Sequence, residues 1–511
     1  MSIELTKKNI RSETVIYDGF CEQSIDSDIN LPDYCPDIMR ILKCTVQPSV
    51  TNSKIVGDRA AADGNAKIRV IYSDENNHIY CYDADFPFSK YAELSSFTDS
   101  AVLLCTAKAD YINCRAVSKR RLDIHGAVSL HFRITACTEE SVITSASGEG
   151  IQLRRKGADL SIAAASAAKT FQIAEVKNVG DSNPGIGKVI FSQAAPVINE
   201  TKIIKGKILL KGETAVKIAY CSDSAQNEAA EMFCNIPFNE ILEAPDFSDS
   251  CTAKSELHVI NLIAEPKVDN DGEYRFMNIS ADICAKVTAY ESESVTVISD
   301  AYSTEAQLDT GYSVLKLPKL QQYFSETVTC RQSPDISAAN PKKIFSCLVS
   351  DPDVKCCFSD GRLHITGKIP LCFIVISEDG SPVSCEREAE FEYSRTVEAT
   401  CKNPQCSPEV HITGFSCLLS PDGTADFKAE IAISAAVFSI CEEKIISELS
   451  VSEGKMPKAR RSSLTVYFCS GQESLWEIAR KYNTTVEAIM EENELSADYL
   501  ENKTMLMIPI K

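Results

Sequence analysis

The stretch that most resembles a phosphate-binding loop runs from Gly180 to Lys188. A P-loop needs four residues between its first glycine and the Gly-Lys pair, then Ser or Thr, on a turn between a strand and a helix. Here Pro184 interrupts the stretch and Val189 follows the lysine. The pattern therefore predicts a turn into a strand and no nucleotide site.

The six histidines do not form a metal-binding pattern. His125 and His131 are six residues apart, so an extended strand would separate them by about 20 Å, too far for one metal ion. His258, His364 and His411 lie in separate strand-like runs, where packing or solvent exposure explains them. Neither Gly-x-Ser-x-Gly nor His-Glu-x-x-His occurs. We therefore predict no cofactor, no metal site and no enzyme activity.

Cysteine is the residue with the unusual count, 22 in the chain. No Cys-x-x-Cys occurs, and the closest spacings are Cys356-Cys357 and Cys401 to Cys406. Two interpretations are open. The favoured one is a reducing compartment in which cysteine serves as a small apolar residue. The other is that the thiols cross-link late, when the compartment becomes oxidising.

Composition excludes several classes of protein. The 511 residues include 52 Lys and Arg against 72 Asp and Glu, a net charge of −20, which argues against a protein that coats nucleic acid. With 44% hydrophobic and 24% charged residues, the chain has the composition of a globular protein. No run of 18 apolar residues occurs, so we predict no transmembrane segment. The first eight residues lack the apolar core of a secretory signal.

Two landmarks recur three times along the chain. One is a proline before a short apolar stretch. The other is the last residue of a strand that is followed, after a polar turn, by a second strand ending at an aromatic residue. They fall at Pro36, Pro184 and Pro341, and at Tyr72, Tyr220 and Ile376. From the first copy to the second, both landmarks shift by 148 residues. From the second copy to the third, the proline shifts by 157 residues and the strand end by 156. Such a period is too long for a solenoid unit, so each repeat is predicted to be a domain.

The repeats read as antiparallel β structure. Apolar and polar residues alternate in 128–134 and 281–287, which is typical of strands buried on one face. Asp-Gly turn signals separate such runs, at residues 63, 271, 360, 379 and 422. The Ala-rich stretch 160–174 is an exception that we predict to be a helix or a mobile connector. We therefore expect a mainly β chain of three tandem antiparallel β-sandwich-like repeats, at 1–148, 149–310 and 311–452.

The C-terminal part changes character. A basic stretch with Pro and Gly, 453–463, is predicted to be a solvated linker, with a docking patch for an acidic partner as the minority interpretation. Residues 464–468 read as a strand, Ser474 and Glu477 as a capping box, Thr484 or Thr485 as the cap of a second helix, and 506–510 as a closing strand. The expected order in 464–511 is β-α-α-β.

This order and its residues resemble a LysM domain. The residues that carry the resemblance are Tyr467, Ser474, Leu475, Trp476, Glu477, Ile478, Ala479, Tyr482, Thr485, Val486, Ile489, Met490, Asn493, Leu495, Leu506, Ile508 and Pro509. The resemblance implies a shallow groove for N-acetylglucosamine-containing glycans, built by the loops after the first strand and before the last. Gln472 and Lys503 stand where LysM domains usually carry glycine, so a protein partner in that groove is an open alternative. The candidate binding residues are Gln472, Glu473, Ser474, Trp476, Asn493, Asn502 and Lys503, with Trp476 either packed or an anchor for a partner.

Taken together, the modules resemble the clostridial spore-coat morphogenetic proteins, whose repeat is the SPOCS domain. The motif of residues 31–38, Leu-Pro-Asp-Tyr-Cys-Pro-Asp-Ile, carries the repeat part of this resemblance. It implies a non-enzymatic scaffold in the mother-cell cytoplasm at the forespore surface and in the spore coat. The LysM domain would bind the SpoIVA-type morphogenetic ATPase of the coat's basement layer, and the repeats would hold other coat proteins. The alternative is a peptidoglycan-binding anchor of the spore cortex or cell wall.

Overall fold

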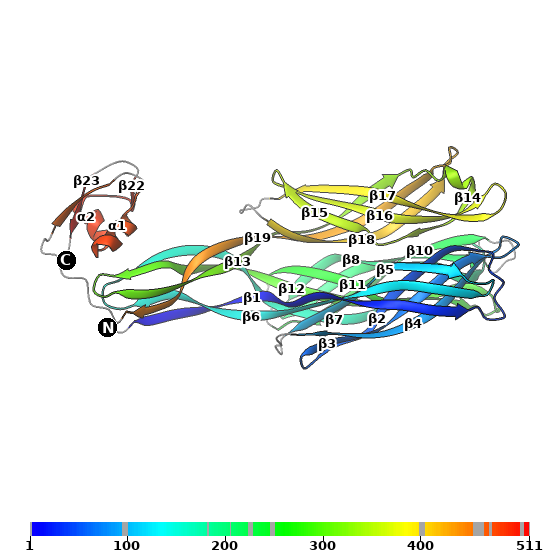
Figure 1. Ribbon diagram of the computed structural model, residues 1–511, viewed down its shortest axis with the longest axis horizontal. Coiled ribbons are helices and arrows are strands. Elements are labelled where there is room, and N and C mark those ends of the chain that lie inside the picture. The colour runs from blue at the N-terminus through cyan, green and yellow to red at the C-terminus, as the bar shows by residue number, and fades with distance from the viewer. Residues whose placement is uncertain are drawn as a thin grey trace.

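The chain folds almost entirely into antiparallel strands, with two short helices near its C-terminus (Figure 1). The computed structural model describes residues 3–94, 101–180, 183–204, 206–222, 228–245, 251–397, 404–452, 464–469, 473–500 and 505–509. The predicted fold class is confirmed, with three sandwich-like repeats and a small C-terminal βααβ unit. None of the described helices is long and apolar enough to cross a membrane.

The first repeat contains two three-stranded sheets, ordered β1-β6-β5 and β2-β3-β4. Its strands are β1 (Glu4–Asn30), β2 (Arg40–Val56), β3 (Arg59–Ser73), β4 (Ile79–Glu93), β5 (Val102–Ala116) and β6 (Arg121–Ser147). The alternating apolar residues of β3 and β6, such as Ile68, Val70, Ile124 and Val128, meet in a core between the sheets. Period-two alternation thus buries one face of each sheet.

The second repeat has the same order of strands, with sheets β11-β12-β7 and β10-β9-β8. Its strands are β7 (Ile151–Asn178), β8 (Ile186–Ile204), β9 (Lys207–Ser222), β10 (Ala229–Glu243), β11 (Thr252–Val268) and β12 (Tyr274–Ser303). The stretch 160–174 lies within β7 and pairs with β12 from Leu160 to Ala174. The prediction of a helix or connector there was wrong, because pairing with β12 outweighs the helix propensity of alanine.

The third repeat follows the same plan with one interruption. Its strands are β13 (Leu308–Gln332), β14 (Pro341–Val349), β15 (Asp353–Ser359), β16 (Arg362–Ser377), β17 (Pro382–Thr396), β18 (Pro404–Leu419) and β19 (Ala425–Val451). Both β14 and β15 pair with β16, as the single strand β2 pairs with β3. The ladder is interrupted beside Pro352, which has no N–H to donate.

A glycine opposite a phenylalanine marks the second sheet of every repeat. The register pairs are Gly64 with Phe88, Gly212 with Phe238 and Gly367 with Phe391. A Cβ added to Gly212 would come within 2.1 Å of the Val197 carbonyl oxygen and 2.5 Å of the Phe238 ring. The ring therefore lies over bare backbone, and only glycine fits beneath it.

The long strands of each repeat continue past their sandwich as a two-stranded ribbon. The ribbons pair 4–13 with 137–147, 151–162 with 291–303, and 308–318 with 440–451. We call these three ribbons the stalk. They extend toward the end of the molecule that holds the N-terminus and the C-terminal unit (Figure 1).

The stalk has a core to which every repeat contributes. Ile143, Ile298 and Ile446 occupy corresponding positions in the three ribbons and belong to one buried cluster. A neighbouring cluster contains Val142, Val297 and Ile445. Since each ribbon alone would expose its apolar face to water, the repeats complete one another's cores.

A second junction between repeats holds buried charged groups. Lys254 and Glu256 on β11 form an ion pair in which both side chains are nearly buried, and Lys286 on β12 donates to Thr135 of the first repeat at 3.0 Å. Burial alone would raise the pKa of Glu256, but Lys254 and Lys286 outweigh it and lower that pKa to about 2. Glu409, on β18 of the third repeat, lies against Glu256.

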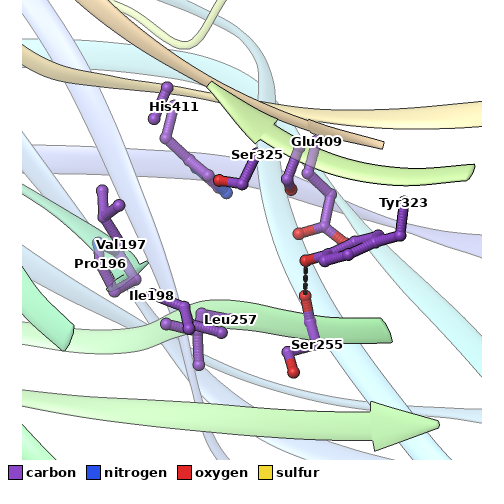
Figure 2. A pocket seen from close by; sticks show the side chains of 11 residues that line it. Pro196, Val197, Ile198, Ser255, Leu257, Tyr323, Ser325, Glu409 and His411 are labelled. Carbon is purple, nitrogen blue, oxygen red and sulfur yellow. Dashed lines mark hydrogen bonds between the residues drawn. The ribbon is translucent and has the colours of Figure 1, made fainter. Parts of the chain in front are cut away.

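Glu409 also lines a small pocket between the second and third repeats (Figure 2). Tyr323 lies at one side of this pocket and its hydroxyl donates to the Ser255 carbonyl oxygen at 3.3 Å (Figure 2). The volume of about 30 Å³ suits ordered water rather than a substrate. The nearby His411 is buried, which lowers its pKa, and burial also lowers the pKa of His258 to about 4. Both rings are therefore neutral at pH 7.

Replacing Glu409 with glutamine should flatten the pH dependence of stability. Burial, reinforced by Glu256, raises the Glu409 pKa from 4.5 to about 8. The unfolded chain therefore loses this proton near pH 4.5 while the folded chain keeps it, so folding stability falls as pH rises from about 4.5 to 8. We expect Glu409→Gln to match the parent near pH 4.5 and to melt at a higher temperature at pH 8. Thermal unfolding at both values tests this, with the exposed Glu388→Gln as control; equal melting at pH 8 would contradict it.

Candidate functional site

The C-terminal unit places two helices on one face of a two-stranded sheet. The sheet pairs β20 (Leu464–Phe468) with β23 (Met505–Pro509), and β21 (Glu473–Ser474) pairs with β22 (Tyr499–Leu500). Helix α1 (Leu475–Tyr482) begins at Ser474, whose hydroxyl accepts from the Trp476 N–H at 3.3 Å. Helix α2 (Val486–Glu492) begins at Thr485, one of the two predicted caps, whose hydroxyl accepts from the Ala488 N–H.

Three of the predicted site residues hold this unit together. The Asn493 amide donates to the carbonyl oxygens of Ile489 and Met507 and accepts from the Met507 N–H, each at 2.7 Å. Glu473 accepts from the Tyr467 hydroxyl at 3.1 Å, and Ser474 is the cap of α1. These polar groups serve the fold. The other predicted positions, Gln472, Asn502 and Lys503, lie outside the described residues.

Trp476 contacts the second repeat. Its indole N–H donates to the Asp300 carboxylate at 2.8 Å, and its ring meets Tyr302 edge-on with centroids 4.9 Å apart. The Tyr302 hydroxyl donates to the Thr484 carbonyl oxygen at 2.8 Å, and the Tyr302 side chain is buried in the core of the C-terminal unit. The Trp476 side chain therefore anchors the C-terminal unit to the end of β12.

Asp300 joins three parts of the chain. Besides Trp476, its carboxylate accepts from Arg480 of α1 at 2.9 and 3.0 Å and from the Tyr312 hydroxyl of the third repeat at 2.9 Å. Ser299 lies at a β-bulge beside it and donates to the Arg154 carbonyl oxygen at 3.1 Å. Sequence reasoning missed Asp300, because no spacing links residue 300 to residue 476.

An open cleft of about 650 Å³ lies at this junction. It is lined by Arg154, Arg155, Lys156, Ser299, Asp300, Tyr312, Glu443, Lys444 and Arg480. Lys156 forms an ion pair with Glu443 at 2.6 Å, and Arg480 forms one with Asp300. Glu443 and Asp300 are the two carboxylates that line the cleft, so both are already paired. Across the described part of the chain, Arg154, Arg155 and Lys444 form no ion pair. The cleft is therefore a basic site within an acidic chain, suited to carboxylate or other anionic groups.

Replacing Asp300 with alanine should release the C-terminal unit from the stalk. The change removes the acceptor of three donors and leaves the half-buried indole N–H and the Arg480 charge unpaired, a loss of about 2–4 kcal/mol from the docked arrangement. Trp476 is the single tryptophan, so its fluorescence reports the contact directly. We expect a red shift of emission without loss of strand content, whereas the exposed Asp309→Ala should leave emission unchanged. An unshifted spectrum for Asp300→Ala would rule out the docked arrangement.

Two known protein families match parts of this chain. The family described as SipL, SPOCS domain matches residues 37–117 and 185–267, and the LysM domain family matches residues 472–509. The SPOCS matches span β2 to β5 and β8 to β11. No curated protein and no solved structure matched the chain.

These matches confirm the resemblance that the sequence motifs indicate. SPOCS domains are sporulation modules and LysM domains are peptidoglycan-binding modules, and both bind rather than catalyse. The third repeat lies outside the SPOCS matches but has the same order of strands as the first two. The chain thus resembles SipL-like sporulation proteins: two of its segments match the SPOCS domain, and its C-terminal part matches the LysM domain.

Proposed function

We propose that the chain is a non-enzymatic scaffold of the bacterial endospore coat. Its LysM domain docks onto the SpoIVA-type morphogenetic ATPase of the coat's basement layer, in the mother cell at the forespore surface, and its repeats hold other coat proteins. The combination of SPOCS and LysM domains supports a role in sporulation. A stalk that joins three repeats and carries a binding domain at its end suits a scaffold.

An exposed apolar face of the LysM sheet carries the proposal that the LysM partner is a protein. Val466, Phe468, Met505 and Met507 lie on the face opposite the helices, and Phe468 and Met505 are directly opposed neighbours across the two strands. Phe468 is 76% exposed and Met505 58%. Large apolar side chains gathered on one flat surface are typical of protein interfaces, and methionine adapts to a partner's shape. The contact with Asp300 leaves this face uncovered.

The alternative function is a peptidoglycan-binding anchor of the cortex or cell wall. The LysM match favours it, since LysM domains bind N-acetylglucosamine-containing glycans. In that case the ligand would bind in the groove that the resemblance to LysM domains implies, rather than on the apolar sheet face.

Replacing Phe468 with aspartate separates the two functions. Placing a charge on the apolar face should weaken binding of the full chain to the purified coat ATPase at least 10-fold, roughly the effect of losing one interface hot spot. Leu418→Asp alters another exposed apolar side chain, 68% exposed on β18, and should bind normally. Biolayer interferometry with the ATPase, beside co-sedimentation with insoluble peptidoglycan, measures both activities. Undiminished ATPase binding by Phe468→Asp, or binding of the parent to peptidoglycan alone, would refute the proposal.

A further inference from the structure

Two cysteine pairs bridge the open seam between the two sheets of a repeat. In the first repeat the Cys44 thiol on β2 contacts the Cys114 thiol on β5, and in the third repeat Cys347 on β14 contacts Cys417 on β18. All four belong to edge strands, at the side where the two sheets lie against each other without hydrogen bonds between them. Each pair therefore connects two strands that no backbone ladder connects.

The two pairs occupy equivalent positions in their repeats. Cys44 lies opposite Val70 on β3, and Val70 comes six residues after Gly64. Cys347 lies opposite Phe373 on β16, and Phe373 comes six residues after Gly367. Gly64 and Gly367 are the glycines that pair with a phenylalanine in their repeats. On the other sheet, Cys114 pairs with Ile124 and Cys417 with Phe427. The sequence separation within a pair is also the same, since 114 − 44 and 417 − 347 both equal 70.

The second repeat lacks a thiol pair at this place. Its equivalent residues are Ser192, opposite Ile218, and Ala264, opposite Ile279. Packing of the seam therefore does not require cysteine, and a smaller side chain suffices. The third repeat has a second contacting pair along the same seam, Cys356 on β15 with Cys406 on β18.

We propose that Cys44 with Cys114, and Cys347 with Cys417, are sites of intramolecular disulfide formation. The oxidant is a small-molecule disulfide such as oxidised glutathione. The resulting bonds clamp the two sheets of the first and third repeats together.

The reaction in the first repeat begins at Cys114. The hydrogen bond from the Cys44 thiol lowers the Cys114 pKa, so Cys114 supplies the attacking thiolate. Its sulfur bonds to one sulfur of oxidised glutathione and expels the other half as a glutathione thiolate. The Cys44 sulfur, after losing its proton, then attacks the Cys114 sulfur of the mixed disulfide and expels the second glutathione. The protein gives up two electrons and two protons, and oxidised glutathione is reduced to two molecules of glutathione.

The clamps should stabilise the fold because each closes a long loop. A cross-link over 70 residues removes considerable freedom from the unfolded chain, and contacting thiols need little movement to bond. We expect oxidation to raise the urea midpoint by roughly 1–2 M.

Peptide mapping of the full chain tests the proposal. The folded protein is equilibrated with oxidised and reduced glutathione, quenched by alkylation, digested and mapped by mass spectrometry. We expect linked peptides for Cys44–Cys114 and Cys347–Cys417, together with the raised midpoint. A Cys44→Ser/Cys347→Ser variant, which introduces the residue type that the second repeat carries at Ser192, should lose both links and the shift. Cys441→Ser, which alters a stalk cysteine, should keep both.

Two outcomes would overturn the proposal. One is that the four thiols are recovered alkylated while other cysteines of the folded chain are oxidised. The other is that they link as indiscriminately as in the urea-unfolded chain. If the double variant does not fold, the map of the parent protein still decides between these outcomes.

Discussion

Replacing Gly212 with alanine is expected to destabilise the second repeat by about 2–4 kcal/mol. The new Cβ would meet the Val197 carbonyl oxygen at 2.1 Å and the Phe238 ring at 2.5 Å. The ring can turn away only by leaving the core, and Val197 can move only by breaking the ladder between β8 and β9. Urea unfolding followed by circular dichroism measures the loss.

Gly157→Ala is the matched control for this experiment. Gly157 also lies in a strand, β7, but a Cβ there would have no atom within 4 Å. Its replacement should change stability by no more than about 0.5 kcal/mol, or stabilise slightly by restricting the unfolded chain. If Gly212→Ala and Gly157→Ala unfold at the same urea concentration, packing of the Phe238 ring does not require a glycine at position 212.

Replacing Lys254 with methionine should cost about 3–5 kcal/mol at neutral pH, because it leaves the nearly buried Glu256 carboxylate without its closest cation. In the parent, the pKa of Glu256 is lowered to about 2, so its ionised form stabilises the fold above pH 4.5 and this contribution is lost as pH falls from 4.5 toward 2. The deficit of Lys254→Met should therefore shrink as the pH is lowered toward 4. Urea unfolding at pH 7.5 and pH 4 compares the two conditions.

Two further variants identify the cause of that deficit. A Lys254→Met/Glu256→Gln double variant removes both charges and should recover part of the stability at pH 7.5. Lys368→Met breaks an ion pair with Glu388 in which both side chains are more than half exposed, and it should leave the urea midpoint almost unchanged. A double variant no more stable than Lys254→Met would mean that the loss comes from packing of the lysine stem instead.

Local patterns in the sequence were enough to predict the strands and the LysM domain. Alternation in 128–134 and the capping residues Ser474 and Thr485 act within a few neighbours along the chain, so their effect is visible in the sequence. The stretch 160–174 shows the limit of this approach. Its alanines favour a helix locally, but the partner that makes them a strand is β12, more than 100 residues away.

The contacts that define the candidate site could not be predicted in this way. Trp476 was singled out by its type, but its partner Asp300 was not, because docking of the LysM domain depends on the shape of two folded surfaces. Glu256 and Glu409 could not be singled out either. In the sequence they are two of many acidic residues, and only folding of the repeats brings them into contact. Burial changes their chemistry, and burial is not encoded in any local spacing.

The stalk also fixes the order in which the molecule can be completed during synthesis. Ile10 and Val142 are translated early, yet their cluster includes Ile445, which lies 303 residues after Val142. At about 5–20 residues per second, a ribosome needs roughly 15–60 s to make the intervening chain. Val297 of the second ribbon is made partway through that interval and can cover part of the first ribbon's apolar face, but the cluster stays incomplete until Ile445 has been made. The nascent chain therefore passes through a stage in which part of the stalk's apolar surface is exposed to water and open to aggregation.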